Sequence, residues 1–115
     1  MKSFFEIVLE EARERKEYFD NYLTYVREIK NRAEKILKEV KVFVFGSVVH
    51  GDYTPMSDID ILIVSNDVPE NIIEQARIKV LLTEGFKPGI FQIHLVKPDD
   101  YEKWYKNFIK DKIQI

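Results

Sequence analysis

Two acidic residues, Asp58 and Asp60, stand at the start of an apolar run that continues to Val64. Successive side chains of a β-strand point to opposite faces, so both carboxylates would project from one face while Ile59 points away. Two carboxylates so placed repel each other unless a cation or a proton lies between them. Mg²⁺ is commonly held by one or two carboxylates together with substrate phosphates. The pattern is short and frequent, however, and on its own it favours the alternative of an exposed strand end where Asp58 caps a turn.

Gly46 and Ser47 directly follow a second apolar run, residues 41–45. A glycine lets the backbone come close to a bulky ligand, and a serine offers both its N–H and its hydroxyl to a phosphate oxygen. If the two apolar runs are neighbouring strands, the loop between them brings these residues and the two acids to the same end of the sheet. That arrangement suits metal-assisted phosphoryl or nucleotidyl transfer. A P-loop is excluded, because no Lys followed by Ser or Thr comes after the glycine.

The elements that would position these residues indicate an α/β (α+β) domain. Residues 4–39 contain neither Gly nor Pro, and apolar residues from Tyr22 to Val40 recur at steps of three and four, which predicts a long N-terminal helix over about 4–39. Its first half is less regular and could be a separate helix or an extension that packs against a partner. Strands are expected at 41–45, 59–64 and 91–96, with one helix starting at Asp67 and ending at Gly85 and another starting at Pro98. We found no repeat or linker, so residues 1–115 are expected to form one domain with a catalytic-type core at about 40–110.

Composition limits the possible functions. The 115 residues are 45% hydrophobic and 33% charged, contain no cysteine and carry a net charge of −2. Thiolate catalysis and disulfides are therefore excluded, and the lack of cysteine fits the cytoplasm. The negative net charge argues against nonspecific binding of nucleic acid. No apolar run approaches the roughly 20 residues that a membrane-spanning helix needs, so no membrane interaction is expected.

The combined motif is more specific than its parts. Gly46-Ser47, ten residues and then Asp58-Ile59-Asp60, with Gly51 in the loop and Ser57 before the acids, resembles the signature of the polymerase-β-type nucleotidyltransferases. The chain length and the segment SDIDILIV resemble the minimal nucleotidyltransferases of archaea and bacteria. The resemblance reaches from about residue 40 to 110. It implies a small mixed β-sheet flanked by helices.

The resemblance also implies a site and an activity. Asp58 and Asp60 would coordinate Mg²⁺, and Gly46, Ser47 and Ser57 would bind a nucleoside triphosphate, with ATP the expected donor. A nucleoside monophosphate would pass to a hydroxyl acceptor, with a third carboxylate on a later strand completing the site. Many family members are encoded beside a HEPN-type protein, and in such pairs the nucleotidyltransferase acts as an antitoxin by transferring AMP to a tyrosine of its partner.

The chain departs from this pattern at Gln92, which stands where the third acid is expected on the strand FQIHLV. A glutamine can ligate a cation through its carbonyl oxygen, but it brings no charge and cannot act as a base. His94 shares a face with Gln92 and could substitute in part, although a lone histidine on an apolar strand is more often a half-buried structural residue. Alternatively, the third acid could come from Glu84 or from a second subunit. Whether the chain forms a homodimer is left open by the sequence.

Near the end of the chain, Asp99 and Asp100 are interpreted as acids that start a helix. Tyr101, Trp104 and Phe108 could stack on a base, but their spacing favours a row that faces the core.

Three hypotheses follow from these residues. The first is an active Mg²⁺-dependent nucleotidyltransferase. The second is a nucleotide-binding or partner-binding module of the same fold with weak or no catalysis, because Gln92 replaces the third carboxylate. The third is a helical interaction protein in which the Asp-x-Asp pattern is accidental.

Overall fold

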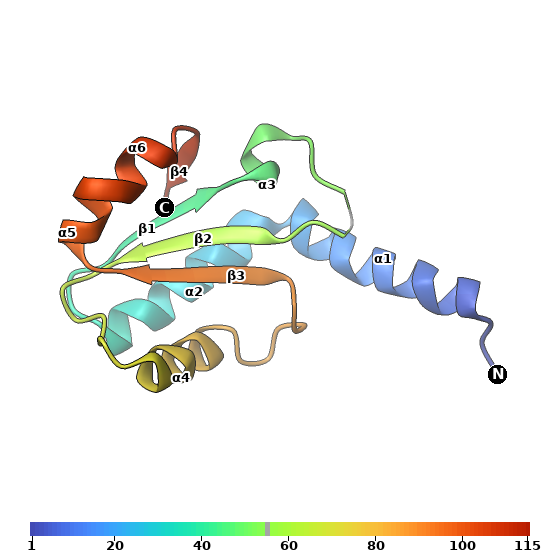
Figure 1. The fold of residues 1–115 in the computed structure, drawn as a ribbon. Helices are drawn as coiled ribbons and strands as arrows, with labels where there is room; N and C mark the ends of the chain where they lie inside the picture. Colours follow the sequence, from blue (N-terminus) through green and yellow to red (C-terminus); the bar gives the residue numbers. More distant parts are fainter. Residues whose placement is uncertain (55) are drawn as a thin grey trace.

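The computed structural model describes residues 1–54 and 56–115 and contains a four-stranded mixed β-sheet flanked by helices (Figure 1). The strands are β1 (Lys41–Phe45), β2 (Ile59–Val64), β3 (Phe91–Val96) and β4 (Lys112–Gln114). Their order in the sheet is β3-β2-β1-β4, with β1 antiparallel to β2 and β4, and β2 parallel to β3. The expected mixed sheet is confirmed. The three predicted strands are present, and β4 is a fourth strand that the sequence did not predict.

The helices cover both faces of this sheet. Along the chain they are α1 (Phe4–Asp20), α2 (Tyr22–Ile36), the short α3 (Ser47–His50), α4 (Ile72–Leu82), and a C-terminal helical segment made of α5 (Pro98–Asp100), the π-helix η1 (Tyr101–Tyr105) and α6 (Lys106–Phe108). Across the described residues, we found no helix with the length and apolar character that crossing a membrane requires.

Alternation of side chains gives the sheet two apolar faces. Val42, Val44, Ile61 and Ile63 lie in the main core together with buried residues of α2 and α4. On the opposite face, a smaller cluster is covered by the C-terminal helical segment and consists of Phe43, Leu62, Val64, Val96 and Tyr101. Strand β2 therefore has apolar neighbours on both faces, which is why its sequence after Asp60 is an unbroken apolar run.

The single N-terminal helix expected over about 4–39 is two helices in the structure. The break lies at Asn21, whose backbone has φ −120° and ψ 28°, and whose side chain donates to the carbonyl of Glu17 at 3.0 Å. An asparagine readily bonds to nearby backbone in this way, so it competes with helix continuation. The second helix ends at Ile36, and the following turn contains Glu39 at φ 50°. The first turns of α1 project beyond the rest of the molecule (Figure 1).

The helix expected to start at Asp67 and to end at Gly85 is instead α4, which spans Ile72–Leu82. Asn71 caps its N-terminus, and the side-chain oxygen of Asn71 accepts from the backbone N–H groups of Ile73 and Glu74. The carboxylate of Asp67 accepts from the backbone N–H of Lys38 at 2.7 Å. A tertiary hydrogen bond therefore uses the side chain that the local pattern had assigned to capping.

The second half of α1 is fixed to the loop between α4 and β3. Lys87 in this loop lies 2.8 Å from carboxylate oxygens of both Glu11 and Glu14, and its backbone N–H donates to the hydroxyl of Tyr18 at 2.8 Å. The ring of Tyr18 also packs edge-on against Phe86 at a centroid distance of 6.3 Å. These contacts place about two turns of α1 beside the loop that leads into β3.

Candidate active site

The strand register brings the two halves of the motif together. Phe45, the last residue of β1, lies opposite Asp60 on β2, so Gly46 follows directly beside this carboxylate. On the other side of β2, Asp60 is paired with Gln92 of the parallel strand β3. Asp60 therefore lies between the end of the strand that carries Gly46-Ser47 and the strand that carries Gln92.

The backbone of Gly46 lies directly against the carboxylate of Asp60. Its backbone has φ 83° and ψ −155°, a conformation that essentially only glycine adopts. A Cβ atom at this position would overlap Oδ2 of Asp60. The sequence suggested that this glycine lets the backbone approach a ligand. In the structure, the group that occupies the space beside it is the Asp60 carboxylate.

Asp60 is more buried than Asp58, and its burial affects the pKa of its carboxyl group. Its side chain is 29% exposed, whereas that of Asp58 is 49% exposed. The pKa of Asp60 is raised, chiefly because burial disfavours the charged form; His94 opposes this shift, and the negative charge of Asp58 adds to it. Nε2 of His94 lies 3.8 Å from Oδ1 of Asp60. A divalent cation between the two carboxylates would relieve their repulsion, so the pair fits a site for a hard cation that uses oxygen ligands.

Arg15 of α1 contacts Asp58 and the backbone next to it. This residue was not identified from the sequence. Its side chain is only 7% exposed, and it donates to the carbonyl oxygens of Ser57 at 2.6 Å and Gly89 at 3.1 Å. It also lies 3.7 Å from Oδ1 of Asp58. A usable signal was present, since Arg15 falls four residues before the buried Phe19 and therefore on the inward side of α1.

Ser57 has partners within its own loop. Its hydroxyl accepts from the backbone N–H of Thr54 at 3.0 Å, and its backbone N–H donates to the Thr54 carbonyl at 2.9 Å. Together with the bond from Arg15, these contacts fix the backbone that leads into Asp58. Ser47 is the first residue of α3, a single turn in which the Gly46 carbonyl accepts from the N–H groups of Val49 and His50.

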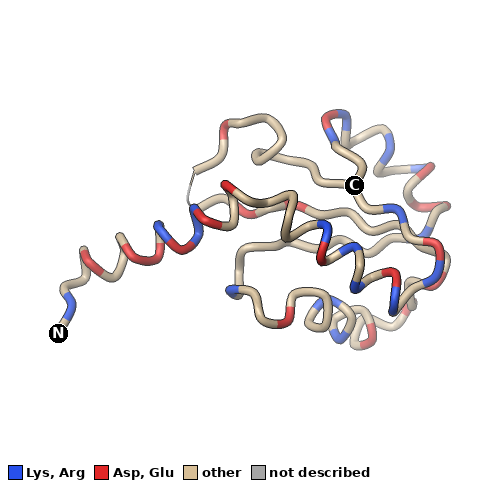
Figure 2. The backbone as a smooth tube through the Cα atoms, turned by 180° about the vertical axis from the view of Figure 1, so that it is seen from behind, with Lys and Arg blue, Asp and Glu red and all other residues tan. Residues whose placement is uncertain are grey.

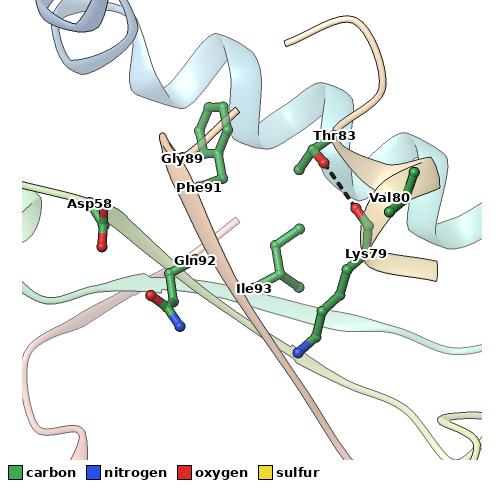
Figure 3. A pocket seen from close by; sticks show the side chains of 8 residues that line it. All are labelled: Asp58, Lys79, Val80, Thr83, Gly89, Phe91, Gln92 and Ile93. Atoms are coloured by element: carbon green, nitrogen blue, oxygen red, sulfur yellow. Dashed lines mark hydrogen bonds between the residues drawn. The ribbon is translucent and has the colours of Figure 1, made fainter. Parts of the chain in front are cut away.

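Gln92 lies on the exposed side of β3, next to a hollow of about 350 Å³ between β3 and α4. Asp58, Gln92 and Lys79 are among the residues that line it, and their side chains extend to the same side in Figure 3. The carbonyl of Lys79 accepts from the hydroxyl of Thr83 at 2.9 Å, which closes the last turn of α4 behind the hollow. Lys79 is a second polar residue, lining this hollow, that the sequence did not indicate, because only the packing of α4 beside β3 brings it there.

Glu84, the alternative source of a third acid, lies outside the candidate active site. Its backbone carbonyl accepts from Arg32 of α2 at 2.8 Å, and it lines a separate hollow with Lys35 and Leu81 on the α2–α4 side. Within residues 1–54 and 56–115, no group of three or more His, Cys, Asp or Glu side chains is arranged to hold a metal ion. Gln92 and His94 are therefore the side chains that β3 offers beside Asp60.

The expected core-facing row in the C-terminal helical segment is only partly present. Tyr101 is buried and stacks on Phe43 at a centroid distance of 5.4 Å, but Trp104 is 59% and Phe108 is 78% exposed. The cause is the π-turn, in which the N–H of Lys106 bonds to the carbonyl of Tyr101. This wider turn breaks the helical spacing on which the prediction relied. Asp99 and Asp100 lie in the first turn of α5, as expected for acids that start a helix.

Charged residues are mixed over the molecule. Figure 2 shows Lys and Arg interspersed with Asp and Glu along α1, α2 and the C-terminal helical segment. This distribution agrees with the net charge of −2.

Comparison with known proteins gives consistent results. The sequence model of the nucleotidyltransferase domain family matches residues 26–114. A Methanocaldococcus jannaschii protein that is named as a protein adenylyltransferase is 32% identical over 91 residues, which cover 77% of this chain and 88% of that protein. The crystal structure of a Sulfolobus solfataricus protein, described as a nucleotidyltransferase, is similar with a TM-score of 0.58 and 25% identity, over 88% of this chain and 85% of that one.

Proposed function

The chain belongs to the nucleotidyltransferase domain family, as a minimal nucleotidyltransferase, and from this premise we propose that it transfers AMP from ATP to a hydroxyl group of a partner protein with the help of Mg²⁺. The observation that carries the proposal is the convergence of Gly46-Ser47, Asp58 and Asp60 at one end of the sheet. Metal-assisted nucleotidyl transfer requires that the residues that bind the metal ion lie beside the residues that bind the phosphate oxygens.

We propose the following roles for the site residues. Asp58 and Asp60 hold Mg²⁺, and Gly46 and Ser47 hold the triphosphate. Ser57 supports the nucleotide site through the loop that it closes with Thr54. Gln92, paired with Asp60, supplies a neutral carbonyl oxygen where a third carboxylate is expected from the family resemblance.

In the reaction, the acceptor oxygen forms a bond to the α-phosphorus of ATP, the bond from that phosphorus to the β-phosphate oxygen breaks, and pyrophosphate leaves. The hydroxyl proton is released to water, since Gln92 has no basic atom to accept it. The metal, when bound, would neutralise charge on the attacking and leaving oxygens. The residues of this chain orient the triphosphate against the two carboxylates, and Arg15 holds the backbone on which Asp58 stands.

The acceptor in this reaction is a hydroxyl group of a protein. The name of the M. jannaschii relative, a protein adenylyltransferase, supports a protein acceptor. We propose that the acceptor is a tyrosine of a HEPN-type protein encoded in the neighbouring gene, and that this modification gives the chain an antitoxin role. This part rests on the family resemblance stated above.

The direct test offers α-³²P-labelled ATP and Mg²⁺ together with the product of the neighbouring gene. The natural chain should label that protein, while the double variant Asp58→Ala/Asp60→Ala and an EDTA-treated sample should not. As a matched control, Asp20→Ala/Glu34→Ala removes two exposed carboxylates outside the site and should leave labelling intact. Labelling that persists without metal and in the Asp58/Asp60 variant would refute the proposal.

The position of Gln92 favours one second candidate, a nucleotide-binding or partner-binding module with weak or no catalysis. Gln92 lies in register with Asp60, so the uncharged position is in the centre of the site rather than at its margin. This candidate predicts Mg·ATP binding by calorimetry without transfer of label. Rapid label transfer by the natural chain would exclude it.

A further inference from the structure

The C-terminal helical segment forms a groove beside the candidate active site. The groove has a volume of about 630 Å³, and the residues that define it here are Phe45, His94, Asp100, Trp104, Tyr105 and Phe108. We call this the aromatic groove. Its volume falls within the range of small-molecule sites, which are typically apolar and contain a few polar groups.

Two residues that line the aromatic groove, Phe45 and His94, are also neighbours of Asp60. Phe45 lies opposite Asp60 in the sheet and directly precedes Gly46. His94 lies 3.8 Å from Asp60, and its ring faces that of Phe45 at a centroid distance of 5.4 Å. A ligand whose phosphates lie at Gly46-Ser47 and Asp60 would therefore have its next chemical group at the mouth of this groove.

Two aromatic rings of the groove, those of Trp104 and Phe108, do not pack in the hydrophobic core. Trp104 and Phe108 are largely exposed, and within the described part of the chain Trp104 has no stacking partner. They are turned away from the sheet by a π-turn, a local conformation that is rare and is frequently found at functional sites. Exposed aromatic rings of this kind are the platforms on which proteins stack nucleobases.

A single acid gives the groove a polar group. Asp100 is one of the residues that line the groove, and among the described residues its carboxylate has no hydrogen bond or ion pair. An ionised carboxylate only accepts hydrogen bonds, so it would select a ring that carries an N–H donor. A base with an exocyclic amine, such as adenine, offers that donor, whereas hypoxanthine has a carbonyl oxygen at the same position.

From these observations we propose that the aromatic groove binds the nucleobase of the donor nucleotide, with Trp104 and Phe108 stacking on the ring and Asp100 accepting from its exocyclic amine. The proposal rests on the proposed function, because it assumes that the triphosphate lies at Gly46-Ser47. It adds a subsite on the C-terminal helical segment and a preference for amine-bearing bases.

Trp104 is the only tryptophan of the chain, so its fluorescence reports directly on the groove. Titration with α,β-methylene ATP, which cannot be cleaved at the reacting bond, should change this fluorescence. Inorganic tripolyphosphate should compete for the site yet leave the fluorescence nearly unchanged. By calorimetry, Trp104→Ala and Phe108→Ala should each weaken binding of α,β-methylene ATP by roughly ten-fold, the scale of one lost stacking contact, and leave tripolyphosphate binding within about two-fold.

Two controls accompany these variants. Phe5→Ala removes an equally exposed aromatic ring on α1 and should change neither affinity. Asp100→Ala should reduce the preference for ATP over ITP, two nucleotides that differ in the amine that this carboxylate would bind. An unchanged preference would contradict the role of Asp100.

The outcomes separate this inference from the function on which it rests. Equal weakening of nucleotide and tripolyphosphate binding, or no fluorescence change with bound nucleotide, would overturn the groove assignment while nucleotidyl transfer stands. A Trp104→Ala variant with an unchanged KM for ATP but a raised KM for the acceptor protein would also overturn it, because the groove would then bind the acceptor. If neither tripolyphosphate nor nucleotide binds at all, the proposed function fails first.

Discussion

Replacing Gly46 with alanine should disturb two things at once, the backbone and the Asp60 carboxylate. The backbone of Gly46, at φ 83° and ψ −155°, lies in a region essentially restricted to glycine, and forcing another residue into it costs about 1–3 kcal/mol. The new Cβ would in addition overlap Oδ2 of Asp60, so the carboxylate must move. We expect a free energy of unfolding lower by about 2–3 kcal/mol, within the 5–15 kcal/mol that a domain typically has.

Gly85 offers a matched control. It also has a positive φ, 86°, but a Cβ there would meet no atom within 4 Å. Gly85→Ala should therefore incur the backbone cost alone, about 1–2 kcal/mol for a left-handed residue, without moving a site residue. Urea unfolding of both variants measures these costs.

The binding of Mg·ATP then distinguishes the backbone cost from the displacement of the Asp60 carboxylate. Calorimetry should show that Gly46→Ala has lost most of its affinity for Mg·ATP, whereas Gly85→Ala binds as the natural chain does after correction for any unfolded fraction. Label transfer should follow the same order. If Gly46→Ala bound Mg·ATP normally, or if Gly85→Ala lost as much affinity, the link from Gly46 through Asp60 to the metal would be refuted.

Three further predictions concern the neighbours of these residues. Gln92→Glu places a carboxylate beside Asp60 and should raise Mg²⁺ affinity in calorimetry; an unchanged or lower affinity would contradict the assigned position. Arg15→Ala removes the guanidinium that donates to the carbonyls of Ser57 and Gly89, so urea unfolding should show a free energy of unfolding lower by about 2–4 kcal/mol. Metal binding should also weaken. A loss of stability with unchanged metal binding would show that Arg15 does not position the acids. In EDTA, the raised pKa of Asp60 means that the folded chain holds this proton more tightly than the unfolded chain, so the Asp60 contribution to stability falls as pH rises from below 3.8 through the raised pKa. Asp60→Asn should therefore gain stability relative to the natural chain between pH 3 and pH 7, and a constant difference across this range would show that burial does not perturb the group.

Much of the sheet could be predicted from the sequence, because its strands are short apolar runs bounded by turn residues. The β1–β2 pair in particular follows from two such runs around a loop with Gly46 and Gly51. The connection, residues 46–58, is long enough for either a parallel crossover or an antiparallel pair, so its length alone does not predict the antiparallel pairing that sets Phe45 opposite Asp60. Strand β4, by contrast, is the segment KIQ, which has no apolar alternation of its own and is ordered by pairing with β1.

The site was predicted where its residues are local in sequence, and missed where they are distant. The Gly-Ser and Asp-x-Asp segments are close along the chain, so spacing alone brought them together. Arg15 and Lys79 reach the same region only because α1 and α4 pack against the start of β3, and no local pattern encodes that packing. The outward orientation of Trp104 was missed for a different reason, since helical spacing assumes a regular α-helix and the π-turn violates that assumption.

The contact of Arg15 with Gly89, which are 74 residues apart, also bears on how the site forms during folding. Arg15 precedes the region that the family model matches, which begins at residue 26, yet it holds the backbone of Ser57 and Gly89. At the opposite end of the chain, Lys112 of β4 pairs with Phe45, the residue before Gly46. Contacts of such long range carry a large loop-closure cost and slow folding. The acids are therefore expected to reach their final positions late, once α1 has packed beside the sheet and β4 has paired with β1. A chain trimmed to residues 26–114 should keep the motif but lose the contacts of Arg15.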